Sequence, residues 1–251
     1  MSGHSKWAGI KHKKAIVDAK RGQAFTRASR EVTIAAKEGG GDVDGNFRLR
    51  LAVQKAREAN MPADKIQAAI DRGTGAGKGE SLEELRYEGY GPAGVAILVD
   101  AMTDNRNRTS ASLKHIFGKY GGNLAESNAV AWMFDRKGII EVDPNGKDAD
   151  EIGLAAIEAG AEDIQVEKGS VEITTQPGDL EAVKNAVEKL GVRVENAEIT
   201  MHPKQTVPVD EDKVASVLRL LEHLEEDDDV QQVYANFDIP ADVLERVSAQ
   251  V

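Results

Sequence analysis

Apolar residues recur every three or four positions along the first quarter of the chain, a spacing that predicts amphipathic helices. The first helix ends at the glycines 39–41, and its apolar stripe consists of Phe25, Ala28, Val32 and Ala35. A second helix is predicted from about Asn46 to Ala59, with the Asn46 side chain as its N-cap. A third begins at Pro62 and ends at Gly73. These patterns predict a three-helix bundle with a thin, alanine-rich core.

A glycine-rich linker at 73–81 separates this bundle from a region where short apolar runs alternate with amphipathic segments. The runs predict strands at 95–99, 130–134, 139–142, 163–166, 171–174, 194–200, 205–209 and 230–236. The segments between them predict helices at 109–120, 149–159, 180–190 and 210–224. From 138 to 200 the order is strand, helix, strand, strand, helix, strand, which is the split β-α-β arrangement.

The elements on either side of this segment read as a second set of the same kind, which predicts that one domain is inserted in the other. The expected fold class is α+β: a three-helix bundle followed by two ferredoxin-like α/β domains. The predicted domains are a basic helical bundle with an N-terminal arm at 1–75, a discontinuous α/β domain at 80–135 plus 203–251, and an inserted split β-α-β domain at 136–202.

Composition places the chain among soluble globular proteins, with 41% apolar and 30% charged residues. It contains no cysteine, which excludes disulfides, thiolate metal sites and cysteine nucleophiles. No apolar run is long enough to span a bilayer, and the charged first residues lack the apolar core of a signal peptide. We therefore expect a cytoplasmic protein.

Charge is distributed unevenly along this acidic chain. The segment from Met1 to Arg72 holds 15 Lys and Arg against 8 Asp and Glu, a balance of +7, whereas the segment from Gly73 to Val251 holds 17 against 35, a balance of −18. Such an asymmetry indicates that one end of the chain meets a polyanion while the rest stays soluble. Nucleic acid is the expected partner, as duplex DNA or ribosomal RNA.

The candidate phosphate contacts are Lys6, Lys11, Lys13, Lys14, Lys20, Arg21, Arg27, Arg30 and Lys37 in the arm and first helix, and Arg48, Arg50, Lys55 and Arg57 in the second helix. Each phosphate neutralised by such a cation adds salt-dependent affinity through counterion release. The alternative is that these cations form an ordinary solvated helix face. Aromatic residues number only 11, so contact with backbone and shape fits better than base stacking along a single strand. Residues 59–62 also permit a helix-turn-helix interpretation, which rests on two adjacent helices alone.

The polar loop Asp104–Thr109 follows a predicted strand and precedes a helix. Asp104, Asn107 or Thr109 would cap that helix, or Arg106 and Arg108 would form a secondary contact with phosphate or carboxylate; both functions are compatible. The acidic run 225–229 lacks an EF-hand pattern and is interpreted as a solvated turn.

Catalytic motifs are not found in the sequence. Gly89–Gly94 matches G-x-G-x-x-G, but it contains proline and leads into a strand, so we interpret it as a tight turn. The linker imitates a phosphate-binding loop at Gly77-Lys78, yet Gly79 stands where a serine or threonine is needed. The five histidines show no metal-ligand spacing. We expect no enzyme activity, cofactor, metal or small-molecule substrate, and no membrane contact.

Several motifs together resemble one family. They are Gly3–Trp7, Lys20–Gly22 with Phe25-Thr26, Asn46 with Arg48–Arg50, Ala59–Pro62, Tyr87–Pro92, Asp104–Thr109, Gly121–Leu124 and Ala131–Phe134. The chain is similar over nearly its whole length to the YebC/PmpR family of transcriptional regulators, which is related to mitochondrial translational activators of cytochrome c oxidase. Phe47, where many members have proline, and Ala125, where glycine is common, depart from the family pattern.

The resemblance implies a three-domain protein with a helical bundle and two α/β domains, in agreement with the segmentation above. It also implies a function: a noncatalytic, DNA-binding transcriptional regulatory protein of the YebC type. The alternative within the same family is a ribosome-associated translation factor that binds ribosomal RNA and aids synthesis of difficult sequences, such as proline-rich ones. Charge does not separate the two, because DNA and RNA present the same phosphate chemistry.

Overall fold

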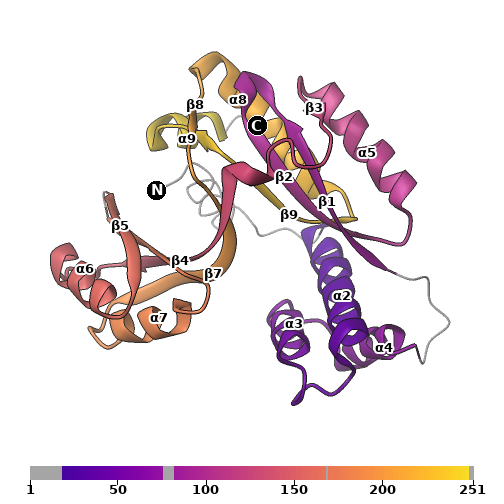
Figure 1. The fold of residues 1–251 in the computed structure, drawn as a ribbon, viewed down its shortest axis with the longest axis horizontal. Helices are drawn as coiled ribbons and strands as arrows, with labels where there is room; N and C mark the ends of the chain where they lie inside the picture. Colours follow the sequence, from indigo (N-terminus) through magenta and orange to yellow (C-terminus); the bar gives the residue numbers. More distant parts are fainter. Residues whose placement is uncertain (1–18, 76–81, 168, 249–251) are drawn as a thin grey trace. The chain divides into compact units, whose positions relative to one another are not determined.

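The structure is a computed structural model that describes residues 19–75, 82–167 and 169–248 (Figure 1). The described residues form two compact units, one of residues 132–206 and the other of residues 19–131 and 207–248. The fold class is α+β, with an N-terminal helical region followed by sheet-containing parts, as the sequence predicts.

The helical bundle comprises α2 (Ala19–Gly39), α3 (Phe47–Glu58) and α4 (Ala63–Gly73). Its core is small, because more than half of the buried residues are alanine or valine: Ala28, Val32, Ala35, Ala36, Leu49, Ala52, Val53, Ala56, Met61, Ile66, Ala69 and Ile70. Each buried alanine contributes little area, so close helix contacts rather than large side chains hold the three helices together.

Asn46 caps α3 as the sequence predicts. Its side-chain oxygen accepts a hydrogen bond from the Leu49 amide at 3.1 Å, and its amide group donates to the carbonyls of Ala35 at 2.8 Å and Gly40 at 2.9 Å. The side chain is buried. One residue therefore starts α3 and also satisfies carbonyl groups at the end of α2.

The sheet of the larger unit has the order β3-β1-β2-β9, with all neighbours antiparallel. Its strands are β1 (Glu83–Tyr90), β2 (Ala96–Thr103), β3 (Asn123–Leu124) and β9 (Val230–Ala235). Helices α5 (Arg106–Lys119) and α8 (Glu211–Glu226) bury their apolar residues against the sheet in one core. The predicted tight turn at 89–94 comprises the last two residues of β1 and most of the connection to β2, which includes a 3₁₀ turn, η1 (Pro92–Gly94).

The smaller unit contains β4 (Phe134–Asp143), α6 (Ala149–Glu158), β5 (Ala161–Glu167), β6 (Ser170–Thr175), α7 (Leu180–Glu188) and β7 (Arg193–Pro203). The sheet order is β5-β6-β4-β7 with antiparallel neighbours, and α6 and α7 pack on the same apolar core. This is the predicted split β-α-β arrangement.

Two predicted strands of the larger unit are wrong or displaced. Residues 130–134 do not form a strand: η2 (Ala131–Met133) lies there, and β4 begins at Phe134. The Glu88 carboxylate accepts the amide hydrogens of Asn128, Val130 and Ala131 at 2.6 to 2.7 Å, so these donors are not available to a neighbouring strand. The strand predicted at 205–209 shrinks to β8 (Val207–Pro208), which pairs in parallel with β10 (Phe237–Asp238). The short helix α9 (Ala241–Ser248) follows.

Strand β1 has no counterpart among the predicted strands because it is rich in charge. Glu83, Glu84 and Arg86 belong to the part of β1 that pairs only with β2, since β3 reaches only Gly89 and Tyr90. A strand with one unpaired edge tolerates charged residues, whereas a fully enclosed strand does not. Along the chain, β2, α5, β3, β8, α8 and β9 keep the predicted strand-helix-strand-strand-helix-strand order. The sheet itself departs from the prediction, because β1 is added between β3 and β2 and β8 pairs with β10 outside the sheet.

Candidate nucleic-acid interface

Six of the predicted phosphate contacts lie at the start of the chain. Lys6, Lys11, Lys13 and Lys14 are outside the described residues, and Lys20 and Arg21 belong to α2 but their side chains are not described. The other predicted cations can be assigned to surroundings of three kinds: ion pairs on the bundle surface, an exposed helix face, and a buried contact with acidic residues.

Lys37, Arg48 and Lys55 are held by other groups of the chain. Lys37 donates to the Leu82 carbonyl at 2.9 Å, and Lys55 pairs with Glu31 at 3.4 Å. Arg48 pairs with both Glu38 and Glu84. Partial burial acts against the charged form of Arg48, but the hydrogen bonds and charges of its two partners outweigh that effect and raise its pKa.

Arg50 and Arg57 are exposed on α3 and flank the stripe of its buried residues Leu49, Ala52, Val53 and Ala56 on one side. Among the residues that the structure describes, neither arginine forms an ion pair. We call the exposed residues of this face the outer stripe of α3: Phe47, Arg50, Leu51, Gln54 and Arg57, spaced three or four positions apart.

The outer stripe combines cations with exposed apolar surface. Phe47 is 67% exposed and Leu51 is 43% exposed, values that are high for residues of this type. The Arg50 guanidinium carbon lies 5.8 Å from the centre of the Phe47 ring, within the range of a cation–π contact. The stripe thus offers two cations and an apolar surface on one rigid element.

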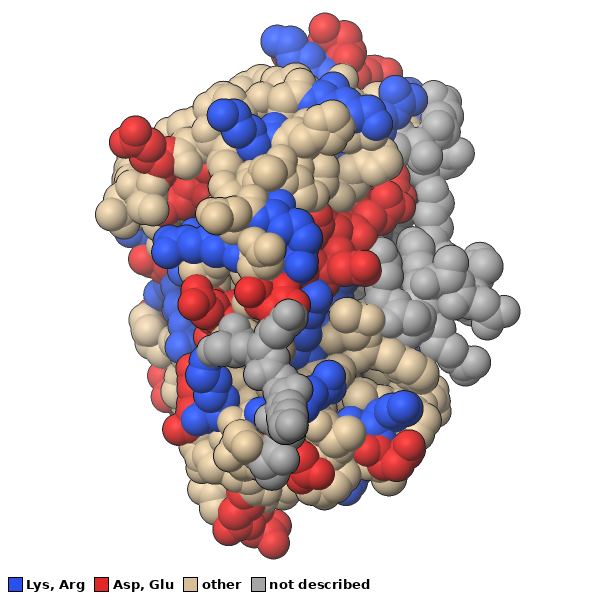
Figure 2. All heavy atoms as spheres, turned by 90° about the vertical axis from the view of Figure 1, so that its right-hand side faces the viewer, with Lys and Arg blue, Asp and Glu red and all other residues tan. Residues whose placement is uncertain are grey.

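On one face of the molecule, cationic and anionic side chains are mixed rather than separated into large areas of one sign (Figure 2). Figure 2 shows a face on which blue Lys and Arg side chains lie among red Asp and Glu side chains. In the bundle, Arg48 and Lys55 pair with carboxylates. The exposed Arg50 and Arg57, which form no ion pair with a described residue, are therefore the more distinctive cations of α3.

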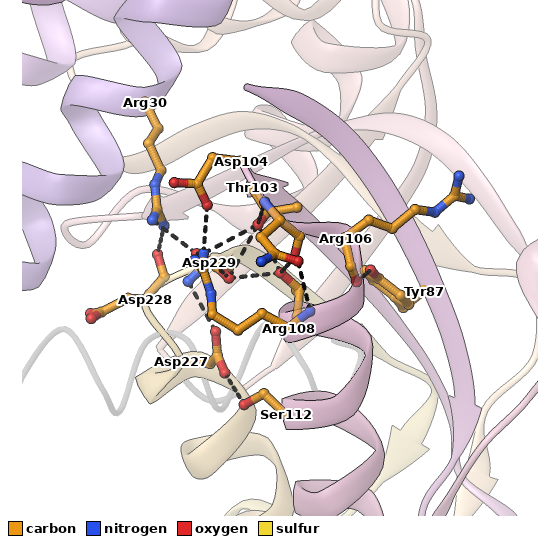
Figure 3. Close-up of polar contacts among 12 residues, drawn as sticks. Arg30, Tyr87, Thr103, Asp104, Arg106, Arg108, Ser112, Asp227, Asp228 and Asp229 are labelled. Atoms are coloured by element: carbon orange, nitrogen blue, oxygen red, sulfur yellow. Dashed lines mark hydrogen bonds and ion pairs between the residues drawn. The ribbon is translucent and has the colours of Figure 1, made fainter. Parts of the chain in front are cut away.

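Arg30 projects from α2 toward the acidic residues that precede β9 (Figure 3). Arg27, one helical turn earlier, is acted on electrostatically by two of the same residues, Asp228 and Asp227. Arg30 lies 2.8 Å from a carboxylate oxygen of Asp229 and also donates to the backbone carbonyl of Asp228. Only 17% of the Arg30 side chain is exposed. These two predicted phosphate contacts are therefore turned toward the α/β part of their own unit.

The Asp229 carboxylate is the centre of this cluster. Besides Arg30, the carboxylate forms an ion pair with Arg108 at 2.9 Å. It also accepts hydrogen bonds from the hydroxyl groups of Thr109 at 2.7 Å and Thr103 at 3.3 Å. Burial favours the neutral acid, but the hydrogen bonds from Thr109 and Arg108 and the two positive charges outweigh it and lower the pKa of Asp229. The carboxylate is therefore held in its charged form.

Asp227 fixes the chain on the other side of the cluster. One of its carboxylate oxygens lies 2.5 Å from the Ser112 hydroxyl of α5, and the other accepts the amide hydrogen of Asp229 at 2.9 Å. The interpretation of 225–229 as a solvated turn is thus wrong for Asp229, which is 5% exposed. No sequence signal indicates this contact, because Asp229 lies 121 positions from Arg108 and 120 from Thr109.

The loop before α5 combines the two functions that the sequence leaves open. Asn105 caps the helix through the Arg108 amide at 3.1 Å, in place of the predicted Asp104, Asn107 or Thr109. Arg108 binds carboxylates, those of Asp104 and Asp229. Arg106 is exposed, and Figure 3 shows its side chain directed away from Asp229.

Arg27 is incompletely bonded. Its Nε and Nη2 atoms are buried and have no hydrogen-bond partner, although Asp228 and Asp227 lie close enough to act on it electrostatically. Burial lowers the pKa of Arg27, and the two carboxylates only partly offset this effect. An arginine with unsatisfied buried donors is costly to keep in place.

Within the described ranges, no group of three or more His, Asp or Glu side chains is arranged to hold a metal ion. None of the described helices is long and apolar enough to cross a membrane.

The described chain thus combines a basic helical bundle with two sheet-containing α/β parts. Family models match both. Residues 5–76 match the TACO1/YebC protein N-terminal domain, and residues 82–237 match the TACO1/YebC second and third domain. The chain belongs to the TACO1/YebC family.

Full-length relatives agree with this assignment. Proteins named "Probable transcriptional regulatory protein" from Natranaerobius thermophilus and Dictyoglomus thermophilum are 55% and 52% identical to the chain over 98% and 99% of its length, and the matches cover 99% and 100% of those proteins. The crystal structure of a conserved hypothetical protein from Aquifex aeolicus is similar with a TM-score of 0.76 and 48% identity, over 90% of this chain and 93% of that one.

Proposed function

We propose that this chain is a cytoplasmic, DNA-binding transcriptional regulatory protein that acts by binding rather than by catalysis. The name shared by its relatives supports the regulatory function. The positive balance of the segment from Met1 to Arg72, in an otherwise acidic chain, supports a polyanionic partner. The proposal involves neither a membrane nor a small-molecule substrate.

The observation that carries the proposal is the outer stripe of α3. A helix fits the major groove of duplex DNA, and exposed arginines at its face reach phosphate oxygens or base edges. Arg50 and Arg57 lie two helical turns apart on that face, and the exposed Phe47 and Leu51 add apolar surface beside them. Such apolar side chains contact sugars, thymine methyl groups or opened base steps.

Replacing Arg50 and Arg57 with glutamine should weaken DNA binding by about tenfold near physiological salt and make the dependence of log affinity on log salt shallower by about 2, because two phosphate contacts are lost. Fluorescence anisotropy with a labelled duplex over a range of salt concentrations measures both quantities. The protein should keep its thermal stability, since both side chains are exposed.

The matched control replaces Arg136 and Arg193, two exposed arginines of the smaller unit, with glutamine. This variant has the same net charge as the α3 variant, so any general charge effect is shared. If both variants lose affinity equally, the outer stripe of α3 is not the contact surface. If the wild-type chain fails to bind duplex DNA at all, the proposed function itself is wrong.

A further inference from the structure

Two of the cations that would serve a nucleic-acid contact are occupied by the chain itself. We call Asp227, Asp228 and Asp229 the acidic segment. Arg30 binds this segment through two groups, the Asp229 carboxylate and the Asp228 carbonyl, and Arg27 lies in the field of the carboxylates of Asp227 and Asp228. The groups that hold the arginines are anionic or carbonyl oxygens, and a nucleic-acid backbone also presents anionic oxygens.

The acidic segment keeps its own structure without these arginines. Asp229 is bonded by Arg108 and Thr109 of α5, and Asp227 is bonded by Ser112 of the same helix. If Arg30 leaves, the Asp229 carboxylate therefore still has a charged partner and a hydroxyl donor. The departure of Arg30 therefore does not leave the buried Asp229 carboxylate without a partner. Most buried ion pairs are hard to break because breaking them leaves such an unpaired charge.

The arginines of this contact have fewer of their hydrogen-bonding groups satisfied than the acidic segment has. Nε and Nη2 of Arg27 are buried with no hydrogen-bond partner. A phosphate group offers several strong acceptor oxygens to such a guanidinium, and paired binding by arginine is geometrically favourable. Arg27 would thus gain hydrogen bonds by exchanging the acidic segment for phosphate, and Arg30 would exchange one anionic partner for another.

We propose that the acidic segment competes with nucleic-acid phosphate for Arg27 and Arg30 and so restrains binding by the helical bundle. This inference rests on the proposed nucleic-acid function and concerns its regulation. With the segment in place, α3 makes the first contact. Release of Arg27 and Arg30 from the segment then adds phosphate contacts from α2 and strengthens the complex.

The test removes charge from the acidic segment and measures binding. Asp228→Asn is the first variant, because it removes the charge that attracts Arg27 but keeps the backbone carbonyl that binds Arg30. Asp228 is exposed, so the fold should tolerate the change. Asp229→Asn, which weakens the buried pair itself, is the second. In full-length protein, each should raise affinity for a labelled duplex, by about fivefold or more for Asp229→Asn, and steepen the salt dependence by about 1.

Glu126→Gln is the matched control, since Glu126 is an exposed carboxylate of the same unit and the charge change is identical. A second control repeats Asp228→Asn in a chain that carries Arg27→Gln and Arg30→Gln. In that background, the gain in DNA affinity from Asp228→Asn should fall to the level of the Glu126→Gln variant, because the two arginines that would be released are absent. A general reduction of negative charge would instead raise affinity in both backgrounds.

The outcomes separate this inference from the proposed function. If the wild-type chain binds DNA and Asp228→Asn and Asp229→Asn bind no better than Glu126→Gln, the competition is refuted and the function stands. If Asp229→Asn fails to fold, as thermal unfolding would reveal, Asp228→Asn alone decides. If wild-type protein does not bind nucleic acid, the failure lies with the function.

Discussion

Glu141 and Glu172 lie opposite each other on β4 and β6, so two carboxylates meet on the face of the sheet of the smaller unit. Burial, together with the negative charges of Glu172, Glu198 and Glu195, raises the pKa of Glu141 to about 7. Glu172 is almost completely buried, and its two carboxylate oxygens have no hydrogen-bond partner. At this position the fold tolerates charge repulsion.

This repulsion predicts that stability falls as pH rises. The unfolded chain ionises Glu141 near its ordinary pKa of 4.5, whereas the folded chain does so near 7, so the folded state holds the extra proton between these values. Stability should decline from about pH 4.5 to about pH 7 and then level off for this group. Glu141→Gln should remove the decline and stabilise the protein at pH 8 by about 1 to 2 kcal/mol, after allowance for partial exposure.

Urea unfolding of the wild type and Glu141→Gln at pH 5.5 and pH 8 measures this difference, with the exposed Glu158→Gln of α6 as the control. The increase in the free energy of unfolding that Glu141→Gln produces should be larger at pH 8 than at pH 5.5. Equal effects of Glu141→Gln at the two pH values would contradict the assigned ionisation.

Single residues differ in how far their function can be predicted from sequence. Asn46 is identified by its position before a helical apolar pattern, because an N-cap bonds only to groups a few residues away. The contacts of Glu88 and Asp229 could not be predicted in this way, since Glu88 bonds to the amide of Val130 and Asp229 to the hydroxyl of Thr109, both far away along the chain. No local pattern indicates such partners.

At the scale of elements, α2 and α4 approach each other at Gly73. A Cβ atom at this position would lie 2.3 Å from the Thr33 carbonyl oxygen and 2.7 Å from the Ala36 Cβ. Thr33 adds to this contact, because its hydroxyl donates to the Ala69 carbonyl at 3.1 Å. The thin core of the bundle depends on backbones that lie this close together.

Gly73→Ala should therefore force α4 away from α2 and destabilise the bundle by about 1 to 3 kcal/mol. Gly118→Ala in α5 is the control, because a Cβ there meets nothing within 4 Å and should stabilise the helix by about 0.5 to 1 kcal/mol. Thermal unfolding followed by circular dichroism compares the two. Equal stability of both variants would show that the close approach at Gly73 is not required.

Helices and enclosed strands are predictable where one periodicity continues over several residues. The stripe of α2 and the apolar run of β2 are examples, although β2 extends beyond the predicted 95–99 to Thr103. Strand β1 is not predictable, because its charged residues are tolerated only by its partly unpaired edge. At 130–134 a strand is predicted because the segment is apolar, and Val130 and Phe134 are indeed buried. The segment does not form a strand, because the Glu88 carboxylate accepts the amide hydrogens of Val130 and Ala131.

At the scale of the whole molecule, the charge imbalance indicates the kind of partner better than it indicates the contact residues. The sequence predicts thirteen cations as contacts in the bundle and its arm. The structure pairs Arg30, Arg48 and Lys55 with carboxylates of the same chain, and leaves Arg50 and Arg57 exposed on one face of α3. The sequence gives the number of cations, but only the fold shows which of them form ion pairs within the chain and which remain exposed.

The family is identifiable from motifs that extend over most of the chain, and the helical region followed by sheet-containing parts agrees with it. The acidic segment is not recognisable from sequence as a partner of α2, because Arg30 lies near the start of the chain and Asp229 near its end. Long-range ion pairs of this kind require the structure.

Competition binding at near-physiological salt decides whether the helical bundle binds promoter DNA or ribosomal RNA. Labelled full-length protein is bound to promoter DNA and challenged with random duplex or with intact ribosomes, and the Arg50→Gln, Arg57→Gln variant is measured beside it. We expect promoter DNA to hold the protein against both competitors and the variant to lose this preference. Displacement by low concentrations of ribosomes, with loss of ribosome binding in the variant, would contradict the transcriptional function and assign the helical bundle to ribosomal RNA.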